Sequence, residues 1–198
     1  MKFIKVILHF IIIVLFTIIT QVGGLIWLFN ILLFKFRKNA TAKILRATTF
    51  IAMYLFCTLF IVPYLAKLNG RTALPIFKSG NLQPLTYLTP LLNRHYVTPA
   101  LKANLFEIAG NFKKETQVLH LTYLDANFPF IDGFPLIPHL SHHDGKKVDL
   151  SFYYQHQNKV SNLKPANSGY GCFVESGLKE INQTQLCLLY TSPSPRDS

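Results

Sequence analysis

Two long runs without a charged residue dominate the first third of the chain, at residues 6–34 and 47–66. As one α-helix the first run would extend about 43 Å, which exceeds the roughly 30 Å hydrocarbon core of a bilayer. The second run has the length that a single crossing needs. We therefore expect two transmembrane helices, the first either tilted as one helix or bent near Gln21-Val22-Gly23-Gly24.

A cleaved signal peptide is the alternative for the first run. Its apolar stretch is about twice as long as the usual hydrophobic region of such peptides, and no small-x-small cleavage site follows it. A retained membrane anchor over residues 1–67 is therefore the better interpretation.

The pattern changes after Lys67. Residues 68–97 mix proline, glycine and polar residues with short apolar pieces, which predicts a linker leading into a domain. Thr98-Pro99 then supplies a helix cap and a first-turn proline, and Lys113-Lys114 suits the end of a helix. The helix between them would have an apolar face made by Leu101, Leu105, Ile108 and Phe112.

Two later segments have strand character, and an irregular segment with three histidines, residues 127–146, joins them. Residues 118–126 are rich in strand-forming residues, and residues 147–155 alternate in polarity. One face of this second strand would carry Val148, Leu150, Phe152 and Tyr154, and the other Asp149, Ser151 and Tyr153. The sequence thus predicts an α+β domain over residues 98–186, after the membrane anchor.

Composition supports a membrane protein. Half of the residues are hydrophobic and 15% are charged, against about a quarter charged in a typical soluble domain. The net charge of +11 would suit nucleic acid, but the early basic residues flank the apolar runs and no acidic residue precedes Glu107. We expect a lipid bilayer as partner and no nucleic acid.

The basic residues also predict an orientation. The loop between the two apolar runs is crowded with Lys35, Arg37, Lys38, Lys43 and Arg46, whereas only Lys2 and Lys5 precede the first run. The positive-inside rule places this loop in the cytoplasm. With two crossings, the N-terminus and everything after about Lys67 would then lie on the far side of the membrane.

The last residues, 187–198, differ from the rest. Cys187 to Asp197 resembles one translated frame of the transposase adapter used to prepare sequencing libraries. We expect this tail to be foreign to the natural protein, which would make the chain a truncated N-terminal piece; a natural Ser/Pro-rich tail is the alternative.

A histidine and a carboxylate at short spacing carry the candidate chemistry. His142 lies in the irregular segment, Asp149 lies on the polar face of the following strand, and Gly145 would allow a tight turn between them. Imidazole nitrogen and carboxylate oxygen both bind zinc at about 2.0–2.2 Å. We therefore predict His142 and Asp149 as metal ligands.

The residues Ser141, His142, Gly145 and Asp149, preceded by Pro138-His139, resemble the zinc motif of the penicillin-insensitive murein endopeptidases. The same pattern occurs more broadly in D-Ala-D-Ala peptidases and their lysostaphin- and hedgehog-like relatives. The resemblance covers residues 124–154. It implies a small antiparallel sheet with flanking helices, one catalytic Zn²⁺, and hydrolysis of peptide cross-links in peptidoglycan outside the bacterial inner membrane, in the periplasmic or extracytoplasmic space.

The resemblance also leaves gaps. It implies a third zinc ligand from a later His-x-His motif, but His156 is the only histidine after Asp149. We therefore expect the third ligand to be missing and the fragment to be inactive. His139 is the candidate for an auxiliary catalytic role, orienting the zinc water or contacting substrate, or else a loop histidine bonded to backbone.

Other polar residues have two interpretations each. Arg94-His95 could bind a substrate carboxylate or lie solvated in a loop. Tyr153 could line the cleft or pack in the domain. We interpret four further polar residues as exposed turn residues: Asp125, Asp132, His143 and Asp144.

Two rival functions remain open. The first is a non-catalytic, membrane-tethered module that binds peptidoglycan or a partner protein. The second is a membrane protein whose histidine cluster is incidental.

Overall fold

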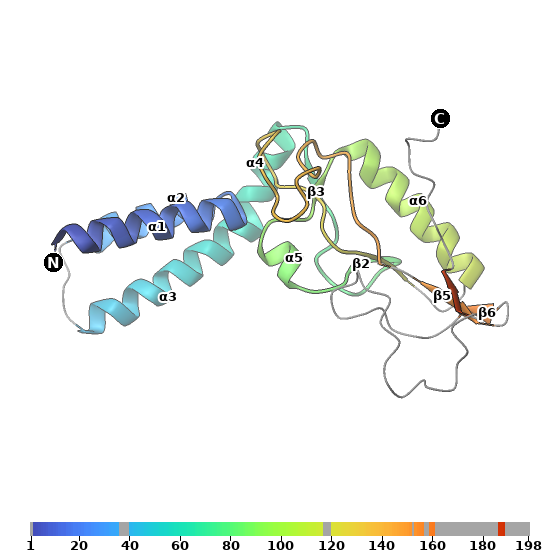
Figure 1. The fold of residues 1–198 in the computed structure, drawn as a ribbon, viewed down its shortest axis with the longest axis horizontal. Coiled ribbons are helices and arrows are strands. Elements are labelled where there is room, and N and C mark those ends of the chain that lie inside the picture. Colours follow the sequence, from blue (N-terminus) through green and yellow to red (C-terminus); the bar gives the residue numbers. More distant parts are fainter. Residues whose placement is uncertain are drawn as a thin grey trace.

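The computed structural model describes residues 2–35, 40–116, 120–151, 153–156, 159–160 and 186–188. It is elongated, with apolar helices at one end and a mixed domain of helices and small sheets at the other (Figure 1). The predicted α+β class is confirmed at this level.

Apolar helices form the first third of the chain. They are α1 (Lys2–Thr20), α2 (Gly23–Leu33) and a continuous stretch made of α3 (Ala40–Phe56), the π-helical turn η1 (Cys57–Ile61) and α4 (Val62–Leu68). Two stretches, Phe3–Thr20 and Thr41–Leu68, are long and apolar enough to cross a membrane, whereas α2 is apolar but shorter.

The uncharged run at 6–34 reverses direction instead of forming one tilted or bent helix. Gln21 adopts a positive φ of 66° between α1 and α2. Gly24 then packs against Thr17, and Trp27, one turn further along α2, lies 6.0 Å from the ring of His9. Later residues of α2 therefore contact earlier residues of α1, so the two helices form an antiparallel hairpin.

The third helical stretch, residues 40–68, packs against this hairpin, and we call the three together the helical unit. Phe50 of α3 stacks on Phe16 with ring centroids 5.2 Å apart and meets Trp27 edge-on at 5.1 Å. The side chain of Asn30 donates to the carbonyl of Arg46 at 3.3 Å. The N-terminus and the start of α3 therefore lie at the same end of the unit, away from the domain (Figure 1).

Among its described residues the domain contains three small sheets instead of the expected single antiparallel sheet. β1 (Thr72–Ala73) pairs with β3 (Tyr96–Val97) in antiparallel fashion, whereas β2 (Leu82–Pro84) pairs with β4 (Leu121–Tyr123) in parallel. β5 (Tyr154–His156) lies between β6 (Lys159–Val160) and β7 (Leu186–Leu188), antiparallel to both. Of the predicted foreign tail, residues 187 and 188 belong to β7, and the others lie outside the described residues.

The predicted helix after Thr98 is confirmed as α6 (Pro99–Thr116), capped by the Thr98 hydroxyl, which accepts from the Leu101 amide at 3.3 Å. Its buried face differs from the prediction, because Ala109 is buried and Ile108 is exposed. This face packs on the main core, which consists of Leu74, Leu82, Val97, Leu105, Ala109, Leu121, Tyr123 and Ala126.

The segment at 68–97 is more than a linker. It forms β1, β2, the short helix α5 (Leu88–Leu91) and β3, and it contributes Leu74, Leu82 and Val97 to the core. Gly70 and Gly80 lie in turns or bends of this stretch, whereas Pro84 belongs to β2 and Pro90 to α5.

The predicted strand at 147–155 is only partly regular. Leu150 forms a single bridge to Tyr123, and the Ser151 amide donates to the carbonyl of Thr122 at 2.9 Å. Regular pairing begins at β5, and Phe152 lies outside the described residues.

A second buried cluster joins the helical unit to the domain. Val62 and Ala66 of α4 pack with Tyr96 of β3. The turn of the α1–α2 hairpin is fastened to the same place, because the side-chain oxygen of Gln21 accepts from the Phe130 amide at 3.0 Å. The domain thus packs directly against one end of the helical unit.

Candidate metal centre

The predicted ligands His142 and Asp149 come together, and His139 joins them. His139 and His142 lie on one turn, in which the His142 amide donates to the His139 carbonyl at 3.0 Å. Asp149 is held beside the chain that follows β4, since its amide donates to the Asp125 carbonyl at 2.8 Å and its carbonyl accepts from the Leu124 amide at 2.8 Å.

The distances suit a tetrahedral metal ion. His142 Nε2 lies 3.1 Å from Asp149 Oδ1, and His139 Nδ1 lies 3.3 Å from Asp149 Oδ2. Two ligands bound to tetrahedral zinc at 2.0–2.2 Å are about 3.4 Å apart. One ligand atom from each of the three residues falls within 4.8 Å of the others.

Hydrogen bonding fixes the ring of His142. Its Nδ1 lies 2.9 Å from the carbonyl oxygen of Ala126, which can only accept, so Nδ1 carries the hydrogen. Without a metal, Nε2 can bond to the Asp149 carboxylate only by carrying a hydrogen as well, whereas its lone pair would become a ligand once a metal displaced that hydrogen. A backbone carbonyl on the outer nitrogen is typical of metal-bound histidine.

Burial and charge act in opposite directions on His142. Burial by itself lowers its pKa, but the hydrogen bond and negative charge of Asp149 outweigh burial, and the pKa is raised. Its side chain is 5% exposed, against 26% for those of both His139 and Asp149. The cluster is therefore anchored inside the domain at His142 and open to solvent beside the other two residues.

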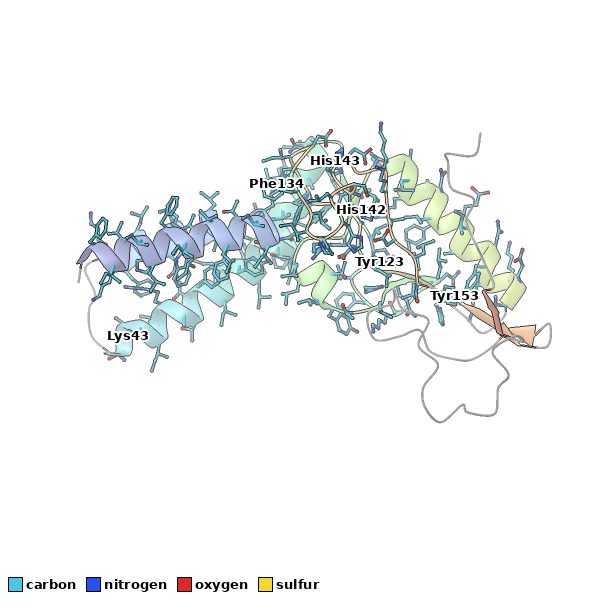
Figure 2. All side chains as sticks on the ribbon, in the orientation of Figure 1. Lys43, Tyr123, Phe134, His142, His143 and Tyr153 are labelled. Atoms are coloured by element: carbon cyan, nitrogen blue, oxygen red, sulfur yellow. The ribbon has the colours of Figure 1, made fainter. Side chains whose placement is uncertain are left out.

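Figure 2 shows His142 within the domain, between the labelled His143 and Tyr123, whereas Lys43 lies at the opposite end of the helical unit. His143 is exposed, and the Asp144 carboxylate accepts from the Lys146 amide at 2.9 Å. Both residues fit the predicted turn.

Asn127 clamps that turn and was not recognised from the sequence. Its side-chain oxygen accepts from the Gly145 amide at 3.0 Å, and its side-chain nitrogen donates to the carbonyls of Lys147 at 2.8 Å and Tyr96 at 3.2 Å. An asparagine eighteen or more residues from its partners leaves no local signal, so only the folded chain identifies it.

Gly145 has a positive φ of 76°, as its predicted turn requires. A Cβ atom at this position would overlap the guanidinium group of Arg71. Arg71 is buried and also pairs with Asp132, so Asp132 is an ion-pair partner although its side chain is exposed.

Arg94 fits neither of its two predicted roles, and Asp125 does not fit its single predicted role. Arg94 is neither solvated nor directed at a free anion, because its Nε and Nη2 lie 3.0 Å from the two oxygens of Asp125. Asp125 is thus a largely buried ion-pair partner instead of an exposed turn residue. Burial raises its pKa despite the opposing charge of Arg94.

Tyr153 packs in the domain. Its ring lies 4.7 Å from that of Phe112, and its hydroxyl donates to the His120 carbonyl and accepts from the Thr122 amide. The packing interpretation is therefore confirmed, and Tyr153 positions the segment that leads away from Asp149.

Comparison with protein-family models, with curated proteins and with solved structures finds no match to this chain.

Proposed function

We propose that this chain is a membrane-anchored, extracytoplasmic zinc hydrolase that acts on the peptide cross-links of peptidoglycan. The observation that carries the proposal is the convergence of donor atoms from His139, His142 and Asp149 within 4.8 Å of one another, with each imidazole 3.1–3.3 Å from an Asp149 oxygen. The motif around His142 supplies the substrate class, because it resembles that of murein endopeptidases.

The donor set fits zinc. Two imidazoles and a carboxylate are a known catalytic ligand set that leaves a fourth position for water or substrate. Zinc bound there would polarise a scissile carbonyl and lower the pKa of its bound water toward about 7. Ala126 fixes the ring of His142, and the partial exposure of His139 and Asp149 leaves a side from which a peptide can approach.

His139 serves as the third ligand in this proposal, in place of the auxiliary role expected from the motif. Its Nδ1 is as close to Asp149 as a second ligand on one ion would be. The third ligand therefore need not come from a later His-x-His motif.

One observation favours a non-catalytic alternative. Peptide hydrolysis requires a general base, and the neighbouring carboxylate of Asp125 is held by Arg94. A module that binds zinc and peptidoglycan without cleaving it remains the second candidate.

The helical unit supports the proposed location in a bacterial cytoplasmic membrane. Because α1 and α2 form a hairpin, the start of α1, which carries Lys2 and Lys5, lies at the same end as the end of α2 and the start of α3, where Figure 2 labels Lys43. The positive-inside rule then places the N-terminus in the cytoplasm with the α2–α3 loop. This orientation replaces the one expected for two crossings, and it keeps the domain outside.

The proposal is tested by metal content and cleavage together. The purified full chain should bind about one zinc per molecule, and His142→Ala should reduce the content to about a tenth or less. His143→Ala removes a neighbouring exposed histidine and should leave the content unchanged. Zinc binding without cleavage of cross-linked muropeptides would select the non-catalytic module, and a chain that binds no zinc would refute the metal centre.

A further inference from the structure

A cavity of about 430 Å³ lies where the helical unit meets the domain. One wall is the helical stretch around η1, and the other is the segment at 73–77 with α5 and His95. Ten of its lining residues are Leu, Ile, Ala, Pro or Phe, and its volume is that of a typical small-ligand site. The apolar lining calls for a hydrocarbon occupant.

The cavity is continuous with the surface proposed to face lipid. Leu55 and Leu59 line it and are 41% and 49% exposed on the apolar stretch Thr41–Leu68. On the domain side, Phe77 and Tyr87 line the cavity and are also exposed. A hydrocarbon chain could pass from bilayer to cavity between these groups without crossing water.

His95 gives the cavity one polar feature. It is 2% exposed, and its Nδ1 has no hydrogen-bond partner among the residues that the structure describes. Burial, reinforced by the charge of Lys102, lowers the pKa of His95 to about 3, so the ring is uncharged at neutral pH. A neutral ring nitrogen suits an ester or hydroxyl group better than an ion.

A second, basic pocket of about 460 Å³ adjoins the cavity through Lys102, which lines both. Its other lining residues are Lys67, Arg71, Thr72, Pro99 and Ala103, so none of the described residues that line it is acidic. Lys102 donates to the Ala73 carbonyl at 2.7 Å and more weakly to the Thr72 hydroxyl. Lys67 is in the last turn of α4, where the apolar stretch ends and lipid headgroups would lie.

We propose that the two pockets together bind one anionic phospholipid from the domain-side leaflet. One hydrocarbon chain occupies the apolar cavity beside Leu59, and the phosphate lies in the basic pocket between Lys67 and Lys102. Arg71 already pairs with Asp132, so it contributes less to phosphate binding. The proposal rests on the proposed membrane insertion, but it is independent of zinc and of hydrolysis.

The full chain is reconstituted into nanodiscs with photoactivatable phosphatidylglycerol that carries a diazirine in one acyl chain. Adducts should map by mass spectrometry to residues 73–77. Leu59→Trp fills the cavity and should lower adduct yield roughly tenfold, the equivalent of 1.4 kcal/mol. Leu45→Trp is the matched control, since Leu45 is on the same helical stretch, is 43% exposed and does not line the cavity.

A second arm tests the charges. Lys67→Gln with Lys102→Gln should reduce phosphatidylglycerol labelling roughly tenfold, while Lys114→Gln, an exposed lysine at the other end of α6, should leave it unchanged. Equal labelling by a phosphatidylcholine probe would overturn the preference for an anionic lipid, and undiminished phosphatidylglycerol labelling in the double lysine variant would overturn the phosphate site. Inserted protein without adducts at 73–77, or with undiminished adducts in Leu59→Trp, would overturn the lipid site. A chain that does not insert would overturn this proposal and the membrane anchor together, whereas loss of zinc binding alone would affect only the hydrolase.

Discussion

Gly145 is the residue on which the turn of the candidate metal centre depends most directly. Its positive φ and its contact with the Arg71 guanidinium both require the absence of a side chain. Gly145→Ala should lower the free energy of unfolding by about 2–4 kcal/mol, because the strained backbone and the displaced buried arginine both contribute. Urea unfolding of the detergent-solubilised chain would measure this change.

Gly133 provides the matched control for Gly145. It has a similar φ of 79°, but a Cβ atom there would meet nothing within 4 Å. Gly133→Ala should therefore cost only about 1 kcal/mol, the price of the left-handed backbone itself. If Gly145→Ala and Gly133→Ala lost equal free energy of unfolding, Arg71 would not constrain the turn at Gly145.

His95 should make the folded chain sensitive to acid. The unfolded residue binds a proton near its usual pKa of 6.5, whereas the folded residue stays neutral down to a pKa of about 3. The unfolded state thus binds more protons in this window, and stability falls by about 1.4 kcal/mol per unit as pH drops through it. Unfolding curves at several pH values between these limits would measure the slope.

A variant without an ionisable side chain at position 95 isolates the contribution of His95 to the pH dependence of stability. His95→Asn should make the slope shallower by about 1.4 kcal/mol per pH unit, while His143→Gln removes an exposed histidine and should leave it unchanged. The same slope in wild type and His95→Asn would contradict a neutral buried imidazole.

At the scale of elements, the α1–α2 hairpin depends on glycine. A Cβ atom at Gly24 would overlap the Thr17 hydroxyl and the Ile13 carbonyl, so the two helices could not keep their present separation. Gly24→Ala should separate them locally. Trp27, the one tryptophan of the chain, packs between His9, Phe16 and Phe50 and would report this as lower fluorescence anisotropy.

Gly110 in α6 is the corresponding control, because it is helical and a Cβ atom there meets nothing within 4 Å. Gly110→Ala should leave Trp27 unchanged and stabilise the domain by up to about 1 kcal/mol through helix propensity. An unchanged anisotropy in Gly24→Ala would mean that the hairpin tolerates a wider spacing.

Helix α6 illustrates how far a periodic pattern predicts an element. The cap at Thr98, the extent of the helix and its basic last turn followed from local residue types. The buried face did not, because Ile108 is exposed and Ala109 faces the core. Strands β2 and β4 pack close to α6, and this close contact favours the small side chain of Ala109. Hydrophobicity alone predicted Ile108 at this face.

At the scale of the whole molecule, the hairpin predicts where the N-terminus lies. In a background without native cysteines, Lys5→Cys, Lys35→Cys and Ser79→Cys would be treated with a membrane-impermeant maleimide on intact spheroplasts. Only Ser79→Cys, exposed on the domain, should be labelled before detergent is added. Labelling of both Lys5→Cys and Ser79→Cys, with Lys35→Cys protected, would restore the orientation of two simple crossings.

The candidate site was partly predictable. The spacing of His142, Gly145 and Asp149 predicted two donors on either side of a tight turn, and the structure brings them within 3.1 Å. The place of His139 depended on the turn that its carbonyl forms with the His142 amide. The partners Ala126 and Asn127 lie too far along the chain for spacing to reveal them.

The apolar character of the first third, the helix after Thr98 and the pairing of His142 with Asp149 follow from local residue patterns, because hydrophobic runs, caps and short turns act over a few residues. The reversal at Gln21, the separation of the described strands into three small sheets, the addition of His139 to the cluster and the two adjoining pockets appear only in the folded chain. These features arise from contacts between distant segments, whose choice depends on how side-chain volumes and buried polar groups are satisfied together.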